Sequence, residues 1–261
     1  MRLAETAKDK GFRLSRHGGL VSTNDEAMAC GRRGDPGRLW IVAETQSGGR
    51  GRNGRVWWSP PGNLYASLLL IDPAPPHKAP ELGFVASLAL ARALREILEG
   101  DRRLAIKWPN DILHDGAKIA GILLESVGLP DGRFACVAGI GVNCRSHPEN
   151  ALYRTTDLSA IGGPPIAPEV VFERLSAAMA HWLDVWTQGS DFAPIRTEWL
   201  SLAAGLGARI SVARPFGAVE GVFRTIDATG RLILDSAAGE VAVEAGDVFL
   251  SPPSGERAAL Q

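Results

Sequence analysis

The chain has 261 residues, and its 28 lysines and arginines nearly balance its 29 aspartates and glutamates, so its formal net charge is −1. This length allows one large domain, alone or with a smaller one, and the charge balance argues against general binding to nucleic acids or membrane surfaces. The polar start predicts no signal peptide, and three cysteines without C-x-x-C spacing argue against a disulfide scaffold or zinc ribbon and indicate the reducing cytoplasm.

Short apolar runs bounded by glycine, proline or polar residues predict buried strands. These runs cover residues 39–45, 63–71, 104–108, 118–126 and 134–144. Apolar residues at helical spacing predict helices, which cover residues 81–98, 168–188 and 191–203. The longest apolar stretch lies in the first of these helices, where Arg92 interrupts it, and it is too short to cross a bilayer.

The pattern changes after "AAGLGA". From residue 208 to residue 250, short strand-like runs alternate with turn signals such as "DATG" and "AAGE", which predicts a small β-barrel of five short strands. We therefore expect a boundary near Gly205. The large domain would cover residues 1–204, the small β domain residues 205–254, and a tail residues 255–261.

Residues 47–55 read "SGGRGRNGR". Arg50, Arg52 and Arg55 lie close enough to repel one another unless an anion lies among them, and the planar guanidinium group suits bidentate binding of phosphate or carboxylate. Because glycine costs much backbone entropy to order, we expect a loop that becomes ordered when it closes on an anionic ligand. An exposed loop that binds nucleic acid through its charge is the open alternative.

The same stretch contains the spacing G-x-G-x-x-G, which formally matches a dinucleotide-binding fingerprint. That motif requires a helix to begin at its third glycine, where the helix N-terminus holds the pyrophosphate. Here "VWWSPPG" follows, which is a poor helix start. We therefore expect no tightly bound redox cofactor.

Polar residues near the ends of predicted strands form a second set. "KWPND" places Lys107 at the end of an apolar run and follows it with Asn110 and Asp111, and Lys118 precedes the next run. Each alone is most simply a turn residue or a strand-end lysine. Because Lys107 and Lys118 flank one hairpin-like unit with an Asp-Gly turn signal, we expect the two lysines to converge.

Two shorter motifs are ambiguous. "STN" at residues 22–24 predicts a helix N-cap. "GIGVNC" places Asn143 at the end of a buried strand, where its side chain either caps a turn or points into a pocket.

Taken in order, "STN", the arginine–glycine loop, "KWPNDI", "KIAGILLE" and "GIGVNC" resemble the biotin protein ligases over about residues 20–250. The resemblance implies an α+β fold, with a class II synthetase-like catalytic domain of mixed β-sheet and flanking helices, followed by a small SH3-like C-terminal β-barrel. It is closest to the short members of the family, because 21 residues before Ser22 are too few for the DNA-binding domain of the repressor-type ligases. Operator binding is therefore not expected.

The resemblance implies an enzyme that uses ATP and Mg²⁺ to convert biotin into biotinoyl-5′-AMP. It then transfers the biotinoyl group to a lysine of a biotin carboxyl carrier protein or domain. A cationic clamp would neutralise charge as two anions meet, and a closed loop would keep water from the mixed anhydride. The nearest rival is a lipoate or octanoate protein ligase. Family members are often dimers, so a homodimer is one expectation; a membrane partner is not.

The residues implied to bind biotin and its adenylate are Ser22, Thr23, Asn24, Gln46, Gly49, Arg50, Gly51, Arg52, Trp57 and Lys118. The first four would surround the ureido ring, Trp57 would form a wall, and Lys118 would meet the carboxylate and the α-phosphate. The residues implied to bind ATP and pyrophosphate are Arg55, Lys107, Asn110 and Asn143, with Asp111 as the carboxylate for Mg²⁺. Catalysis would depend on Arg52, Lys118, Lys107 and Asp111. The last predicted strand, "GDVFLSPP", offers no basic residue to the nucleotide.

Overall fold

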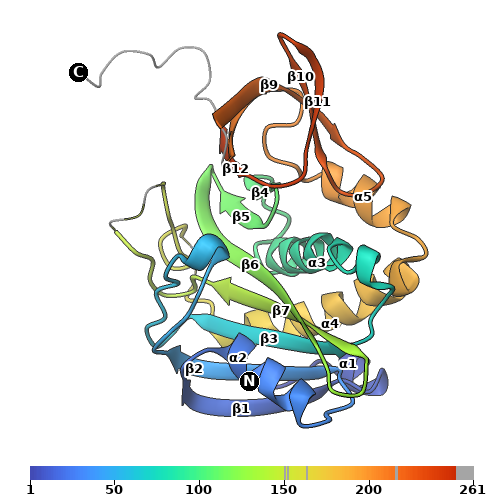
Figure 1. Ribbon diagram of the computed structural model, residues 1–261. Helices are drawn as coiled ribbons and strands as arrows, with labels where there is room; N and C mark the ends of the chain where they lie inside the picture. The colour runs from blue at the N-terminus through green and yellow to red at the C-terminus, as the bar shows by residue number, and fades with distance from the viewer. Residues whose placement is uncertain (150, 152, 163, 215–216, 251–261) are drawn as a thin grey trace.

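The computed structural model describes residues 1–149, 151, 153–162, 164–214 and 217–250. Two β-sheets form its framework, a seven-stranded sheet and a five-stranded sheet. Figure 1 shows the smaller sheet above the larger one, with α3 (Glu81–Ile97), α4 (Pro168–Trp186) and α5 (Ala193–Leu200) along one side.

The larger sheet has the strand order β1-β2-β3-β7-β6-β5-β4. Its strands are β1 (Arg13–Leu20), β2 (Leu39–Gln46), β3 (Leu64–Ile71), β4 (Leu104–Lys107), β5 (Asp111–His114), β6 (Ala117–Gly128) and β7 (Phe134–Val142). Strands β1 and β2 run parallel, and the other neighbouring pairs run antiparallel. The mixed sheet expected for this part of the chain is therefore confirmed.

Helices pack on both faces of the larger sheet, since successive residues of a strand point to opposite sides. On one face, α3 and α4 enclose the main core, where Trp40 meets Phe172 edge-on with 5.4 Å between ring centroids. On the other face, α2 (Thr23–Arg32) covers a smaller cluster that includes Ile41 and Leu69. The rest of this second face carries a cavity.

The smaller sheet is antiparallel, with the order β11-β10-β9-β8-β12. Its strands are β8 (Arg209–Arg214), β9 (Gly217–Ile226), β10 (Leu232–Ser236), β11 (Gly239–Val243) and β12 (Asp247–Leu250). The five predicted strands are confirmed, but the closed barrel is wrong for residues 209–214 and 217–250, where β11 and β12 are outer strands that do not pair with each other. The outer strands β11 and β12 each pair along one edge only, whereas a closed barrel requires every strand to pair along both edges.

The two sheets are joined by contacts of the β4–β5 hairpin. The Trp108 indole nitrogen donates to Gly230 O, in the turn between β9 and β10, at 3.2 Å, and Ile106 N donates at 2.7 Å to Leu202 O in the segment that leads to β8. The predicted boundary between the two domains, between residues 204 and 205, stays a prediction. Residues 251–254 of the predicted small domain and the predicted tail lie outside the described residues.

Three elements were not predicted: α1 (Glu5–Asp9), β1 and β5. Strand β1 is an edge strand with polar residues on both faces, so it lacks the apolar alternation that reveals a strand. Strand β5 has only four residues, directly after the turn that "KWPND" forms. Three short 3₁₀ turns complete the described elements: η1 (Arg52–Gly54), η2 (Pro76–Lys78) and η3 (Thr187–Gly189).

All three cysteines are free, as expected. Among the described helices, none combines the length and apolar character needed to span a membrane.

Candidate active site

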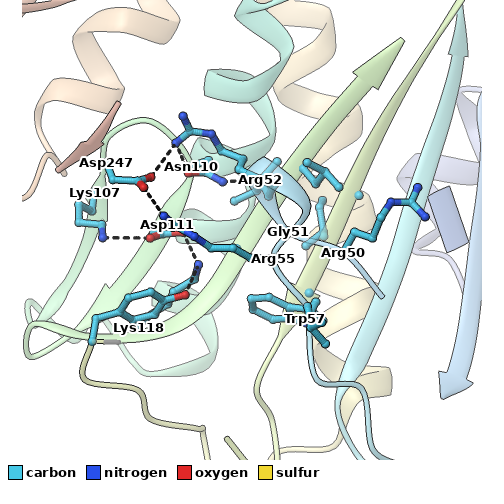
Figure 2. Close-up of a pocket in the computed structure, with 18 of the residues that line it drawn as sticks. Arg50, Gly51, Arg52, Arg55, Trp57, Lys107, Asn110, Asp111, Lys118 and Asp247 are labelled. Atoms are coloured by element: carbon cyan, nitrogen blue, oxygen red, sulfur yellow. Dashed lines mark hydrogen bonds and ion pairs between the residues drawn. The ribbon is translucent and has the colours of Figure 1, made fainter. Parts of the chain in front are cut away.

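A cavity of about 390 Å³ lies on the second face of the larger sheet. Its lining comes from the start of α2, the arginine–glycine loop, strands β5 to β7, and β12 of the smaller sheet. Figure 2 shows two loop arginines directed into the site, Arg52 toward Asn110 and Asp247, and Arg55 toward Asp247. Segments far apart in the sequence therefore supply one site.

Three glycines form the flat floor of this cavity. Gly121 and Gly141 are register partners on β6 and β7, and Gly139 lies on the same face two residues earlier in β7. A Cβ atom at Gly141 would lie 2.4 Å from Trp57 Cε2, and one at Gly139 would lie 2.2 Å from Asn24 Oδ1. Carbon atoms pack at about 3.5–4.0 Å, so only glycine lets Trp57 and Asn24 rest against the sheet.

Uncharged polar groups at the start of α2 form one end of the cavity. Ser22 caps the helix as predicted, because its hydroxyl accepts a hydrogen bond from Asp25 N at 3.4 Å. The Gln46 side-chain oxygen accepts from Thr23 N at 2.8 Å and from Thr23 Oγ1 at 3.1 Å. These bonds fix the first turn of α2 against the end of β2.

Two residues that the sequence did not single out hold Asn24. Its Nδ2 donates to Glu125 Oε2 at 2.7 Å, and its Oδ1 accepts from Ser67 Oγ at 2.6 Å. Ser67 is fully buried and lies 2.7 Å from Thr23 Oγ1 as well. Because both ends of the Asn24 amide have partners, its orientation is set before any ligand arrives.

The arginine–glycine loop is a short hairpin with η1 at its tip. Gly51 N donates to Arg55 O at 2.7 Å, and Trp57 N donates to Gly49 O at 2.9 Å. A Cβ atom at Gly49 would lie 2.7 Å from Trp57 O, so this close approach requires glycine. The element that follows the loop is strand β3 and not an α-helix, so the loop lacks the helix start that a dinucleotide fingerprint requires.

Arg50 points away from the other loop arginines in Figure 2. Its guanidinium nitrogens donate to both Asp25 oxygens, at 2.8 and 2.6 Å, and one lies 3.5 Å from Glu125 Oε2. The hydrogen bonds to Arg50 lower the pKa of Asp25, and the same bonds raise the pKa of Arg50. Arg50 thus binds the first turn of α2 while it lines the cavity.

Strand β12, which the sequence showed to lack a basic residue for the nucleotide, instead supplies an acidic residue to the arginine–glycine loop. Arg55 donates to Asp247 Oδ2, and Arg52 Nη1 lies 3.8 Å from Asp247 Oδ1. Arg52 also donates to Gly246 O at 3.2 Å and to Asn110 Oδ1 at 3.4 Å. Burial lowers the pKa of Arg52. Asp247 therefore links two of the three loop arginines to the smaller sheet.

The predicted convergence of Lys107 and Lys118 is confirmed, and Asp111 lies between them. Lys107 Nζ is 3.1 Å from Asp111 Oδ2, and Lys118 Nζ is 2.5 Å from Asp111 Oδ1. Burial opposes the charge on Asp111, but the two ammonium groups outweigh it and hold the pKa of this carboxyl below its ordinary value. Lys118 Nζ also lies 5.3 Å from the centroid of the Trp57 ring and 5.2 Å from that of Tyr153.

The residues around Asp111 do not fit a metal ion held by the protein alone. Both carboxylate oxygens already face lysine ammonium groups. In the part of the chain that the structure describes, no three histidine, cysteine, aspartate or glutamate residues group together to hold a metal ion. Magnesium commonly arrives on nucleotide phosphates with only one or two protein carboxylates, and a role for Asp111 in binding it stays a prediction.

Thirteen of the fifteen predicted site residues line the cavity, and Gly49 and Asn143 do not. Asn143 is buried and donates from Nδ2 to Thr156 O at 3.1 Å, so it fastens the chain that follows β7. Asn143 therefore neither caps a local turn nor lines the cavity, and its role in binding ATP stays a prediction. The cavity residues that the sequence missed include Tyr153 and Asp247, for which no local motif gives a signal.

The arrangement suits a ligand of mixed character. The polar end near α2 offers uncharged donors and acceptors, the middle is bounded by the Trp57 ring, which rests on the glycine floor, and the far side is cationic. Such a site can orient a flat polar ring, pack against its apolar part, and bring two anionic groups together.

Two family models match the chain. The Biotin/lipoate A/B protein ligase family matches residues 32–143, and the Biotin protein ligase C terminal domain matches residues 205–251. A biotin–[acetyl-CoA-carboxylase] ligase of Paracoccus denitrificans is 41% identical over 236 residues, which are 87% of this chain and 96% of that protein. The chain belongs to the biotin protein ligase family.

Other members of the family are similar to this chain in sequence or in fold. A biotin–[acetyl-CoA-carboxylase] ligase of Mycobacterium tuberculosis is 30% identical over 87% of this chain and 85% of its own. The structure of a biotin protein ligase from Aquifex aeolicus in complex with biotin and ATP matches with a TM-score of 0.77 and 26% identity, over 92% of this chain and 98% of that one. A Leishmania major ligase in complex with biotinyl-5-AMP has a TM-score of 0.63, with coverages of 89% and 99%, but at 24% identity it bears on the fold alone.

Proposed function

We propose that this protein is an ATP-dependent biotin–protein ligase. It activates biotin as biotinoyl-5′-AMP and transfers the biotinoyl group to a lysine of a carboxylase's biotin carrier domain. The observation that carries this proposal is the arrangement of the cavity lining, which runs from uncharged polar groups past Trp57 to the cations of the loop and of β4–β6. The family membership and the relatives' names support it.

Biotin has the matching polarity, with a ureido ring at one end and a carboxylate at the other. We place the ureido ring against Ser22, Thr23, Asn24 and Gln46, where the hydrogen-bonding groups are fixed. The apolar part of the bicycle then packs against Trp57, whose ring rests on the glycine floor. This orientation leaves the carboxylate near Lys118.

Activation brings together a carboxylate and a triphosphate, which repel each other in water. A biotin carboxylate oxygen attacks the α-phosphorus, and the bond from that phosphorus to pyrophosphate breaks. Lys118 and Arg52 stabilise the charge that develops on the α-phosphate, and Arg55, Lys107 and Asn110 bind the leaving pyrophosphate. Magnesium enters as part of the MgATP substrate. In the second step, the acceptor lysine amine attacks the biotinoyl carbonyl, and AMP leaves as a proton is lost from the amine.

ATP–pyrophosphate exchange by the purified protein tests the proposal directly. We expect exchange with biotin and none with lipoate, octanoate or no acid. Exchange with lipoate or octanoate instead would keep the chemistry and overturn the substrate. A folded protein that shows no exchange with any of the acids in the presence of Mg²⁺ would overturn the proposal, and salt-sensitive binding to oligonucleotides would then favour the nucleic-acid alternative.

The cellular setting belongs to the same proposal. We propose that the protein acts in the cytoplasm, where a reaction that consumes ATP and modifies a carboxylase would take place. The expected homodimer remains to be tested by measuring the mass in solution with and without biotin and ATP.

A further inference from the structure

The mouth of the cavity carries exposed apolar side chains that the proposed chemistry does not use. Val56, Tyr153 and Phe249 all line the cavity, yet they are 86%, 38% and 54% exposed. They come from the arginine–glycine loop, the chain after β7, and β12 of the smaller sheet. We define these three residues as the apolar rim.

Ion pairs of the site fasten the two segments that carry Val56 and Phe249. Val56 forms an isolated β-bridge with Arg50 and directly follows Arg55, which pairs with Asp247. Phe249 lies two residues after Asp247 on β12, so both side chains point to the same side of that strand. The loop and β12 therefore present their apolar side chains on a framework fastened by ion pairs.

Exposed apolar groups that converge around one opening differ from scattered ones, which need no explanation. Trp57, the glycine floor and the lysines already line the cavity where a small ligand would bind, so the rim residues are not needed to surround it. Aromatic side chains such as those of Tyr153 and Phe249 are enriched at the centre of protein–protein contacts. The proposed reaction requires such a contact, because a lysine of a second protein must pass this opening to reach the adenylate.

We propose that the apolar rim is the docking surface for the acceptor protein and that it contacts the apolar surface next to the accepting lysine. This inference rests on the proposed function. It assigns Val56 and Phe249 to recognition of the protein substrate and gives them no part in adenylate formation.

The two half-reactions separate these roles. The variants are Val56→Ser, Phe249→Ser and the double variant; Tyr153 is left intact because its hydroxyl lies 3.4 Å from Lys118 Nζ. The matched control is Val170→Ser on α4, which is 47% exposed and does not line the cavity. ATP–pyrophosphate exchange with biotin reports the first half-reaction. Transfer from preformed biotinoyl-5′-AMP to a biotin carrier domain of acetyl-CoA carboxylase reports the second, with hydroxylamine as a small nucleophile for comparison.

We expect the double variant to keep the exchange rate and the hydroxylamine rate of the unmodified protein. Its half-saturating concentration of carrier domain should rise by about 10-fold or more, since exposed hot-spot side chains dominate such contacts. The Val170→Ser control should leave both half-reactions unchanged.

An unchanged half-saturating carrier concentration would overturn the inference. So would a parallel loss of exchange, which would mean that the rim covers the nucleotide. An unmodified protein that fails to exchange with biotin would instead overturn the proposed function, so the two failures are distinguishable.

Discussion

Replacing Gly141 with alanine tests whether the glycine floor sets the position of Trp57. The new Cβ would lie 2.4, 2.5 and 2.7 Å from Trp57 Cε2, Nε1 and Cζ2. Carbon atoms pack at about 3.5–4.0 Å, so the ring must withdraw from the sheet by about 1 Å. Overpacking of this kind costs roughly 1–3 kcal/mol. Because biotin needs the ring in its original place, we expect the same energy to appear as a loss of biotin affinity of about 5- to 150-fold.

Isothermal titration of biotin into the folded variant measures this loss. The control is Gly128→Ala on β6, where an added Cβ meets no atom within 4 Å. Urea unfolding of both variants separates a loss of stability from a loss of affinity. Gly141→Ala binding biotin as tightly as the unmodified protein would refute the reasoning, as would an equal loss in Gly128→Ala.

Three further substitutions test the charged groups. Asp111→Asn leaves the ammonium groups of Lys107 and Lys118, whose side chains are 16% and 10% exposed, without their carboxylate, which should lower the free energy of unfolding at pH 7 by about 3–5 kcal/mol. Since the folded pKa of Asp111 is depressed, its stabilisation is lost as pH falls below about 4, so urea unfolding should show a smaller difference between variant and parent there, and a constant difference would contradict this. Lys118→Met should slow ATP–pyrophosphate exchange by about 10²–10³-fold, and near-normal exchange from a folded variant would remove Lys118 from the site. Asp247→Ala should change the free energy of unfolding by no more than about 1 kcal/mol, because the ion pairs to Arg52 and Arg55 are partly exposed. It should speed hydrogen exchange at the amides of the arginine–glycine loop, and an unchanged rate of hydrogen exchange would show that β12 does not fasten the loop.

The parts of the site predicted from the sequence are those in which residue type and local spacing carry the information. Clustered arginines among glycines marked the loop, and the hairpin signal between Lys107 and Lys118 predicted that the two would converge. Family resemblance then supplied roles that periodicity alone does not give. The mixed sheet was likewise expected, whereas the polar edge strand β1 had no apolar pattern to reveal it.

The parts that were missed depend on contacts between distant segments. Ser67 is one of several residues in an apolar strand, and nothing local shows that its hydroxyl meets Asn24. Asp247 is 192 residues from Arg55, so only the folded chain shows their ion pair. Gly139 and Gly141 look like ordinary small residues of β7 until Trp57 and Asn24 are seen to lie on them.

The pairing of the site's cations with carboxylates has a consequence for discrimination among anions. Four carboxylates, Asp25, Asp111, Asp247 and Glu125, face five of the six lysines and arginines that line the cavity. The local field is therefore nearly balanced, and chloride or inorganic phosphate must compete with internal partners for each cation. A single small anion gains little from that exchange. A molecule with several negative groups and a flat apolar body replaces several partners at once, so the site's own counter-charges make it selective for such a molecule.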